Sequence, residues 1–581
     1  MNAPLRRFAL FPVLLLLSAC AAMGVGSDPA QTSAPRSGGG SYDLVIEGGR
    51  IVDGTGAAWF HGDVAVRGDR IVRVAPPGML RNVAARDRID ATGLVVAPGF
   101  IDIQGQSRSA VLRGDGRLVS KVTQGVTTEI LGEGSTDAPV NERILEAGGV
   151  RDSAAVARLR RFEGPRGFDA WLRAIEEHGV STNVGSFVGA STIRTFGRGL
   201  AMGAASQSEM EAMQEAVRDA MRDGAFGLAS ALIYPPGNFA GTEELTLLAR
   251  AMAPYGGLYI THMRSEADRL LEAIDEAIEI GRRGGVPVEI YHLKAAGRRN
   301  WGKAAAAIAR IDSARAAGLD VQADMYPYVA GGTGLTACFP PWVSADGRLL
   351  QNLRDQNVRA RIREEIRAND GSWENLCELA TPEGVLLLGF EREGNRGLVG
   401  RRLAEVATMM GSDWIDTAMD LVLSEEQRIG TIFFMMDEDN VRLQLQQPWI
   451  KFGTDASGVD PDAADGLVHP RAYGTFTRIL GRYVRDEGVL PLEDAVRKMS
   501  SAVATRLRIR DRGLLTEGFF ADIVVFDPET VSDRATYEDP HQLSTGILHV
   551  LVNGVPVVRD GSHTGATPGR ALRGPGWTGR R

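Results

Sequence analysis

The chain has 581 residues, of which 44% are hydrophobic and 24% charged, values that exclude wholesale disorder and are compatible with two or three domains. Its 65 basic and 73 acidic side chains give a net charge of −8, so it lacks the basic excess typical of nucleic-acid-binding proteins. The three cysteines, Cys20, Cys338 and Cys377, are too few for a disulfide framework or a CxxC metal site. We therefore interpret Cys338 and Cys377 as packed thiols.

The first 41 residues have the features of an export signal followed by a tether. Two arginines precede an apolar run over residues 8–17, which is too short to span a bilayer. The run ends in Leu-Ser-Ala-Cys, which resembles a bacterial lipobox, so residues 1–19 are expected to be a signal peptide and Cys20 to carry lipid. A plain secretory signal is the alternative. Residues 20–41, rich in Ala, Gly, Ser and Pro, predict a flexible tether. We expect an exported protein anchored by lipid to the cell envelope, on the outer membrane facing the periplasm.

Both ends of the remaining chain contain short stretches in which apolar and polar residues alternate. They lie at residues 42–47, 63–66, 70–74, 521–526 and 550–558. Such alternation is typical of β-hairpins. We expect one small β-sandwich domain built from residues 42–95 and 505–575.

The middle of the chain, residues 96–504, alternates between short apolar strands and helical stretches. The expected strands cover residues 95–103, 127–131, 257–261, 286–291, 320–325 and 450–453, and the helices include 208–223, 266–283 and 303–316. This repetition predicts an α/β fold with a parallel sheet, either a (β/α)8 TIM barrel or a doubly wound sheet. Residues 340–430 interrupt it with charged helices and few strands, which predicts an insertion or lid.

Four chemically active side chains follow expected strands directly: Glu133, His262, His292 and Asp455. In a barrel the carboxyl ends of the strands meet at one mouth, where reactions occur. The histidines are 30 residues apart, about one strand-plus-helix unit, which predicts neighbouring strands. Imidazole and carboxylate groups suit Zn²⁺, so we expect a metal site at this mouth. The alternatives are structural histidines and an aspartate that caps a helix.

Several motifs then occur in a characteristic order. They are VVAPGFID at residues 95–102, QGVTT at 124–128, THMRSE at 261–266, YHLK at 291–294, DMYPY at 324–328, GTD at 453–455, HPRAYGTF at 469–476 and ADIVVFD at 521–527. Together they resemble the N-acyl-D-amino-acid deacylase (D-aminoacylase) family of the amidohydrolase superfamily, across residues 42 to about 570. The resemblance implies a (β/α)8 barrel with a β-sandwich from both chain ends. It also implies hydrolysis of the amide bond of N-acyl-D-amino acids.

Matched position by position, the resemblance implies one zinc ion per chain, held by Glu133, His262 and His292. Glu133 stands where the family's pattern has a cysteine ligand. Asp455 is expected to be the catalytic acid and base. Tyr234 is expected to help hold the scissile carbonyl.

The same resemblance implies a clamp for the substrate α-carboxylate, formed by Lys294, Tyr326 and Arg471. Lysine and arginine supply charge-assisted hydrogen bonds to a carboxylate. The expected partner is therefore a small molecule with a free carboxylate. We interpret Arg264 and Glu266 as a salt bridge that steadies the loop after His262.

The chain departs from the family's pattern after the first barrel strand, where most amidohydrolases have His-x-His. Here the residues are Gln104, Gly105 and Gln106, and a neutral amide is a weak ligand, so a second metal ion is not expected. We favour an active one-metal deacylase, because the other site residues are retained together. The alternatives are another amidohydrolase, such as a dipeptidase or cyclic-amide hydrolase, and a catalytically silent lipoprotein that binds acylated amino acids or cell-wall peptides. The sequence does not indicate the oligomeric state.

Overall fold

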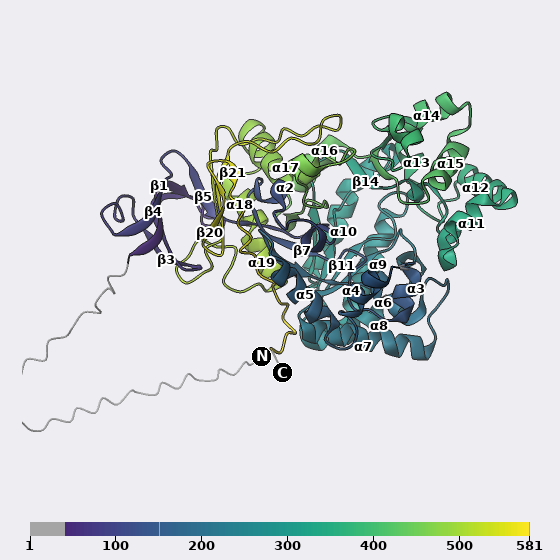
Figure 1. Cartoon of the computed structure of the whole chain (residues 1–581), viewed down its shortest axis with the longest axis horizontal. Coiled ribbons are helices and arrows are strands. Elements are labelled where there is room, and N and C mark those ends of the chain that lie inside the picture. The colour runs from purple at the N-terminus through teal and green to yellow at the C-terminus, as the bar shows by residue number, and fades with distance from the viewer. Residues whose placement is uncertain (1–40, 150–151, 580–581) are drawn as a thin grey trace, which may run out of the picture. The chain divides into compact units, whose positions relative to one another are not determined.

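Strands from both ends of the chain pair in one sheet of the computed structural model (Figure 1). The structure describes residues 41–149 and 152–579, so the predicted signal peptide, Cys20 and residues 20–40 of the predicted tether lie outside the described residues. Within these residues the sheet has nine strands, in the order β21-β20-β19-β18-β5-β1-β2-β3, with β4 paired to β1. The strands are β1 (Tyr42–Ile51), β2 (Phe60–Arg67), β3 (Arg70–Ala75), β4 (Ala85–Asp90), β5 (Val95–Pro98), β18 (Ile523–Phe526), β19 (Ile547–Val552), β20 (Val555–Arg559) and β21 (Ser562–His563).

This sheet is packed on both faces, because successive residues of a strand point to opposite sides. Leu44 and Ile46 of β1 join one hydrophobic cluster, whereas Val45 between them joins another. The alternating stretches seen in the sequence are therefore strands, as predicted. β5 joins the two ends of the chain, since it pairs with β1 in parallel and with β18 in antiparallel.

A second set of strands is parallel throughout. In the described part of the chain it comprises a six-stranded sheet, β17-β13-β12-β11-β10-β9, and a three-stranded sheet, β6-β7-β8. The bounds are β6 (Phe100–Asp102), β7 (Val126–Leu131), β8 (Asn183–Ser186), β9 (Val188–Gly189), β10 (Gly227–Ala231), β11 (Leu258–His262), β12 (Val288–Ile290), β13 (Val321–Met325) and β17 (Ile450–Phe452). The α/β class with a parallel sheet is confirmed.

The strand prediction was wrong in two places. The single strand expected at residues 95–103 is split at Gly99 into β5 and β6. Gly99 lies against Thr127, where an added Cβ would come within 2.2 Å of the threonine Cγ2. The strands β8, β9 and β10 were missed, because sequences such as Gly-Leu-Ala-Ser-Ala in β10 contain few of the β-branched residues that signal a strand.

Helices follow most of the parallel strands (Figure 1). They include α5 (Gly167–His178), α6 (Ala190–Arg198), α7 (Gln207–Asp223), α8 (Thr242–Met252), α9 (Leu270–Gly284), α10 (Ala304–Ala316) and α16 (Glu438–Leu445). α7 begins at a capping box formed by Ser206 and Glu209 and ends at Gly224 in the left-handed conformation. α9 begins at Leu270, after the predicted residue 266, because the segment before it is held by contacts of the site described below.

Residues 330–434 leave the parallel strands and form their own core between β13 and β17. Five helices lie here, α11 (Leu349–Arg354), α12 (Gln356–Ala368), α13 (Leu376–Ala380), α14 (Leu403–Met410) and α15 (Trp414–Glu425). Figure 1 shows them grouped together. An antiparallel sheet that the sequence did not indicate accompanies them: β14 (Ala330–Gly334), β16 (Gly430–Phe434) and β15 (Val385–Leu387). Among the described residues, none of the helices has the length and hydrophobicity needed to span a bilayer.

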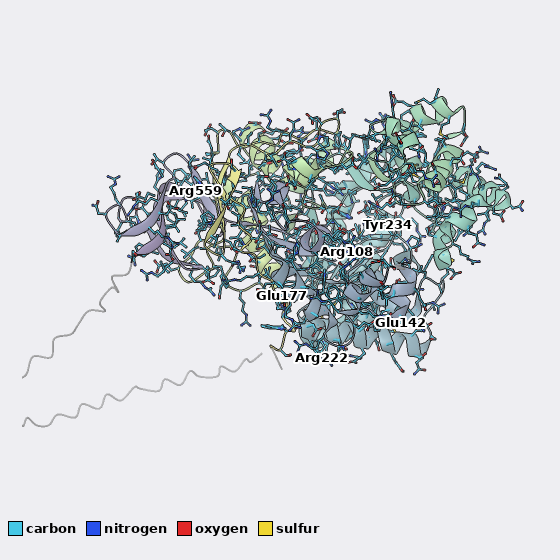
Figure 2. The ribbon with its side chains drawn as sticks, viewed as in Figure 1. Arg108, Glu142, Glu177, Arg222, Tyr234 and Arg559 are labelled. Atoms are coloured by element: carbon cyan, nitrogen blue, oxygen red, sulfur yellow. A yellow bond between two sulfur atoms is a disulfide. The ribbon has the colours of Figure 1, made fainter. Side chains whose placement is uncertain are left out.

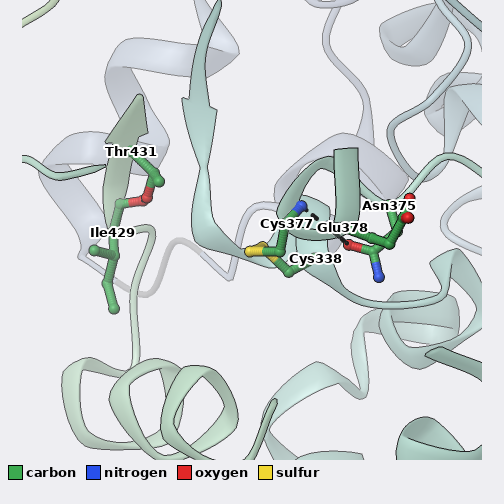
Figure 3. The surroundings of a disulfide bond; sticks show 6 residues. All are labelled: Cys338, Asn375, Cys377, Glu378, Ile429 and Thr431. Atoms are coloured by element: carbon green, nitrogen blue, oxygen red, sulfur yellow. Dashed lines mark hydrogen bonds between the residues drawn. A yellow bond between two sulfur atoms is a disulfide. The ribbon is translucent and has the colours of Figure 1, made fainter. Parts of the chain in front are cut away.

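Cys338 and Cys377 form a disulfide inside this insertion, so their interpretation as packed thiols was wrong (Figure 3). The bond joins the 3-10 turn η4 (Leu335–Cys338) to α13, and both cysteines are fully buried. The Asn375 side chain caps α13 by accepting hydrogen bonds from the backbone N–H groups of Cys377 and Glu378, at 3.0 and 3.2 Å. The pairing was hidden from sequence reasoning because the insertion core brings together two segments that are 39 residues apart.

We expect loss of this disulfide to weaken the insertion. The double substitution Cys338→Ser and Cys377→Ser should lower the free energy of unfolding by about 2–4 kcal/mol, because the unfolded chain gains entropy when the loop is released. Denaturant unfolding measures the change relative to the oxidised wild-type protein, and reduced wild-type protein should behave like the variant. A thiol titration of the denatured, unreduced Cys20→Ala variant should find no free thiol; two free thiols would contradict the assignment.

Candidate metal centre and active site

Three predicted ligands meet at the carboxyl ends of parallel strands, of which β11 and β12 are neighbours. Glu133 follows β7, His262 ends β11 and His292 follows β12. Oε1 of Glu133 lies 3.2 Å from Nδ1 of His262 and 3.3 Å from Nε2 of His292. The three ligand atoms lie within 4.8 Å of one another, and all three side chains are largely buried. The structure thus brings together the residues that the strand-end argument selected.

This donor set fits a divalent metal ion. One carboxylate oxygen and two imidazole nitrogens converge, which is a ligand combination that zinc prefers. The far side of each ring faces one further carboxylate, Glu266: its Oε1 lies 2.9 Å from His292 Nδ1 and its Oε2 lies 3.8 Å from His262 Nε2. A carboxylate behind a histidine is the usual way to orient a metal-binding imidazole. Nε2 of His262 is buried and has no hydrogen-bond partner within residues 41–149 and 152–579.

Glu266 also defines the position of Lys294. Nζ of Lys294 donates to both Glu266 oxygens, at 2.7 and 2.8 Å, and lies 2.7 Å from Nδ1 of His292. Burial favours a higher pKa for Glu266, but the charges of Lys294 and of the two histidines hold it below its usual range. The prediction of a salt bridge between Arg264 and Glu266 was wrong. Arg264 pairs instead with Glu276 of α9, at 2.9 Å.

Asp455 follows β17 and faces the metal ligands. Its Oδ1 accepts a hydrogen bond of 3.0 Å from Nε2 of Gln106, and its Oδ2 lies 2.8 Å from Nη1 of Arg471. Burial raises the pKa of Asp455, whereas the Arg471 charge opposes the rise. The backbone of Asp455 has a φ of +46°, and that of His292 a φ of +33°. Both are left-handed conformations that are costly for such residues and are found mainly at functional sites.

The predicted clamp residues line the same cavity as the metal ligands and Asp455. The cavity has a volume of about 740 Å³. The Arg471 guanidinium lies 4.5 Å from the centre of the Tyr326 ring, and Nζ of Lys294 lies 5.7 Å from it. All three clamp residues are buried. The backbone N–H of Arg471 donates to Nδ1 of His469 at 3.1 Å, while Nε2 of His469 contacts the carbonyl of Ala330 at 2.8 Å. His469 therefore fixes the segment that carries Arg471.

Tyr234 lines the same cavity, and Figure 2 shows it in the same region of the molecule as Arg108, another lining residue. Its ring centre is 5.3 Å from that of His262. Burial raises the pKa of Tyr234 well above its usual value, so the hydroxyl keeps its proton and can donate a hydrogen bond.

A contact between the insertion and the site was not predicted from the sequence. Oε2 of Glu374, which comes from the insertion, accepts hydrogen bonds from Ser265 Oγ at 2.8 Å and from the Glu266 backbone N–H at 2.7 Å. Burial and the charge of Glu266 raise the pKa of Glu374 to about 7. Glu374 lies in a loop of the insertion, and no motif marks it.

A buried cluster supports the first strand of the site and was also missed. Nζ of Lys121 lies 2.7 Å from Oδ2 of Asp102 and 3.2 Å from Oε1 of Glu129, and it donates to Thr454 at 2.6 Å. Lys121, Asp102 and Glu129 are fully buried. The cluster joins the end of β6 and the interior of β7 to the segment that precedes Asp455.

Comparisons with known proteins agree with this site. A family model described as "Amidohydrolase family" matches residues 378–558. D-aminoacylase of Alcaligenes xylosoxydans xylosoxydans is 36% identical over 533 residues, which cover 91% of this chain and 97% of that protein.

Two solved structures extend the likeness to three dimensions. One is a D-aminoacylase with a binuclear metal centre, for which one-metal activation and second-metal attenuation are described. Its TM-score is 0.75 at 34% identity, and the match covers 92% of this chain and 100% of that chain. The other is N-acyl-D-glutamate deacylase from Bordetella bronchiseptica with zinc and a phosphonate that mimics the tetrahedral intermediate, with a TM-score of 0.74, 33% identity and the same coverage.

The identity of more than 30% over nearly the whole length of a relative agrees with the motifs, the parallel strands and the cluster of Glu133, His262 and His292. The chain belongs to the D-aminoacylase (N-acyl-D-amino-acid deacylase) family of amidohydrolase enzymes.

Proposed function

We propose that this protein removes the acyl group from N-acyl-D-amino acids with the help of one zinc ion, releasing a carboxylate and a free amino acid. The observation that carries the proposal is the convergence of Glu133, His262 and His292 in one cavity with Asp455 and Arg471. The relatives support it, because they include a D-aminoacylase and a zinc-bound N-acyl-D-glutamate deacylase. The preference for the D configuration rests on these relatives.

Glu133, His262 and His292 would hold the ion, which when bound supplies Lewis-acid polarisation of the scissile carbonyl and makes water in the site more acidic. Asp455 accepts the proton of the attacking water and then donates it to the leaving nitrogen. Tyr234 donates a hydrogen bond to the carbonyl oxygen as negative charge develops there. Glu266 keeps both histidine rings in place.

The substrate carboxylate is held opposite these groups. Arg471 and Lys294 supply positive charge, and both lie near the Tyr326 ring, at 4.5 and 5.7 Å from its centre. Lys294 is paired with Glu266 and Arg471 with Asp455, but Nε of Arg471 is buried and has no hydrogen-bond partner among the described residues. Arg471 is therefore the main contact, and Lys294 contributes mostly through its field. Fixing the carboxylate orients the amide bond toward Asp455.

We further propose that the parallel strands close into a (β/α)8 barrel and that the nine-stranded sheet forms a β-sandwich domain. Support for closure is an isolated parallel bridge between Gly105, beyond β6, and Ala456, beyond β17. The order β9, β10, β11, β12, β13, β17 continues the order β6, β7, β8 in the same direction. The mouth at the strand ends then contains the site.

The localisation that we propose is export followed by lipid attachment at Cys20. The support is the lipobox-like sequence before Cys20 and the Cys338–Cys377 disulfide, since disulfides are stable in compartments outside the reducing cytosol. Lipid would hold the enzyme at the envelope membrane, with the outer membrane facing the periplasm as the proposed site.

The proposed role of Asp455 is tested by Asp455→Asn. Loss of the acid and base group should lower kcat/KM for N-acetyl-D-amino acids by about 10²–10⁴-fold, while the zinc content of the variant stays that of the wild type. Hydrolysis is measured against N-acetyl-L-amino acids as well. Asp462→Asn is the matched control, because Asp462 is exposed in the same segment. Full activity in Asp455→Asn, or no hydrolysis by zinc-loaded wild type, would refute the proposal.

The carboxylate clamp is tested by measuring the Arg471→Lys variant on two substrates, one with the α-carboxylate and one in which a neutral carboxamide replaces it. The variant should lose on the order of 10–100-fold in kcat/KM for an N-acetyl-D-amino acid, because a two-pronged charged contact is replaced by a single ammonium. For the corresponding carboxamide substrate, kcat/KM should differ little between the variant and the wild type, because that substrate has no carboxylate charge for either side chain to bind. An equal loss on both substrates, or faster hydrolysis of cyclic amides than of N-acyl amino acids, would argue against the clamp.

The lipid anchor is tested by Cys20→Ala. The variant should move from the membrane fraction to the soluble periplasmic fraction, because one residue carries the whole anchor. Mass spectrometry of the mature wild-type N-terminus is the independent measurement. A wild-type protein that is soluble and begins elsewhere than at a lipidated Cys20 would show a plain secretory signal instead.

A further inference from the structure

The two glutamines that replace the family's His-x-His contact the metal ligand Glu133 directly. Nε2 of Gln104 and Nε2 of Gln106 each lie 2.6 Å from Oε2 of Glu133. Its other oxygen, Oε1, faces the two histidines. An ionised carboxylate can only accept hydrogen bonds, so both contacts require the NH₂ group of the amide. Glu133 therefore presents one oxygen to the metal site and has the other occupied by two donors.

Gln106 also connects the two acidic groups of the site. The second hydrogen of its NH₂ group points to Oδ1 of Asp455 at 3.0 Å. One amide thus donates to the ligand carboxylate and to the catalytic carboxylate at the same time. Two carboxylates that share a buried site repel each other unless a cation or hydrogen-bond donors offset their charge, and here Gln106 supplies the donors.

The backbone around the glutamines is rigid. The N–H of Gln104 donates to Oδ1 of Asp102 at 3.1 Å, and the N–H of Gln106 donates to the carbonyl of Ala456 at 3.0 Å. Between them, Gly105 lies so close to Glu129 that an added Cβ would be 2.1 Å from its Cγ. The strand end is held on both sides, which keeps both amides directed at Glu133.

We propose that Gln104 and Gln106 are positioning residues that replace a second metal ion, so that the centre binds one ion and cannot accept another. Their N–H hydrogens occupy the carboxylate oxygens of Glu133 and Asp455 that a second cation would need as ligands. Oε1 of Gln104, the atom that could bind a cation, is buried, and Gln104 is not among the described residues that line the cavity. The inference rests on the proposed one-zinc function. It implies that excess zinc does not attenuate this enzyme, in contrast to the second-metal attenuation described for D-aminoacylase.

The test is a zinc titration of the purified full chain after chelation, with zinc chloride as the only ligand. Bound zinc is counted by elemental analysis and its dissociation constant is measured without substrate. The wild type should saturate at one ion per chain in excess zinc. Gln104→Met and Gln106→Met keep the length of the side chain but remove the donors. Each should bind zinc about 10–100-fold more weakly at an unchanged melting temperature.

Two further variants complete the experiment. Gln447→Met is the matched control, because Gln447 only donates to the carbonyl of Leu443 outside the site, and its zinc affinity should equal that of the wild type. The double variant Gln104→His and Gln106→His should take up a second ion. Two ions bound by the wild type, or Met variants with wild-type affinity, would overturn the inference and leave the proposed function standing. A wild type that binds no zinc would instead remove the proposed function, and the inference with it.

Discussion

The carboxylate of Glu133 is the interaction on which the rest of the active site depends, because its two oxygens serve different neighbours. Oε1 faces His262 and His292, and Oε2 accepts the amides of Gln104 and Gln106. Burial alone would raise the pKa of this carboxyl, but the hydrogen bonds from both histidines hold it well below its usual value. The ionised form is thus matched on both oxygens, which is the condition for burying a charge. Glutamate stands here for the family's cysteine, and two glutamines stand for its histidines. The two changes are linked, because both glutamines donate hydrogen bonds to the glutamate.

Behind the ligands, Glu266 organises the second layer of the site. It faces both histidines, pairs with Lys294, and through its backbone N–H contacts Glu374 of the insertion. The disulfide at Cys377 lies three residues from Glu374 in the same segment. The insertion is therefore tied to the metal centre by a short path of buried polar contacts, and its position bears on the shape of the cavity.

The strand ends were predictable from the sequence, and with them the positions of Glu133, His262, His292 and Asp455. The reason is geometric: parallel strands bring their carboxyl ends to one edge, so a single rule places residues that are far apart in the chain. The hydrogen-bonding partners were not predictable in this way. Glu266 could pair with Lys294 or with Arg264 on grounds of charge alone. Which of the two it contacts depends on rotamers that only the packed structure defines. The Cys338–Cys377 bond and the sheet of β14, β15 and β16 arise from pairing across a long insertion without a sequence repeat. Strands of mostly small residues, such as Gly-Leu-Ala-Ser-Ala in β10, lack the side chains that would have revealed them.

The central claim is that Glu133, His262 and His292 hold a single ion beside Asp455. It is tested most directly by anomalous X-ray scattering at the zinc edge from crystals of the full chain grown in excess zinc. The account predicts one strong peak bounded by these three side chains, with Gln104 and Gln106 still bonded to Glu133. A second peak between the glutamines and Asp455, or a peak bound by other residues, would contradict it.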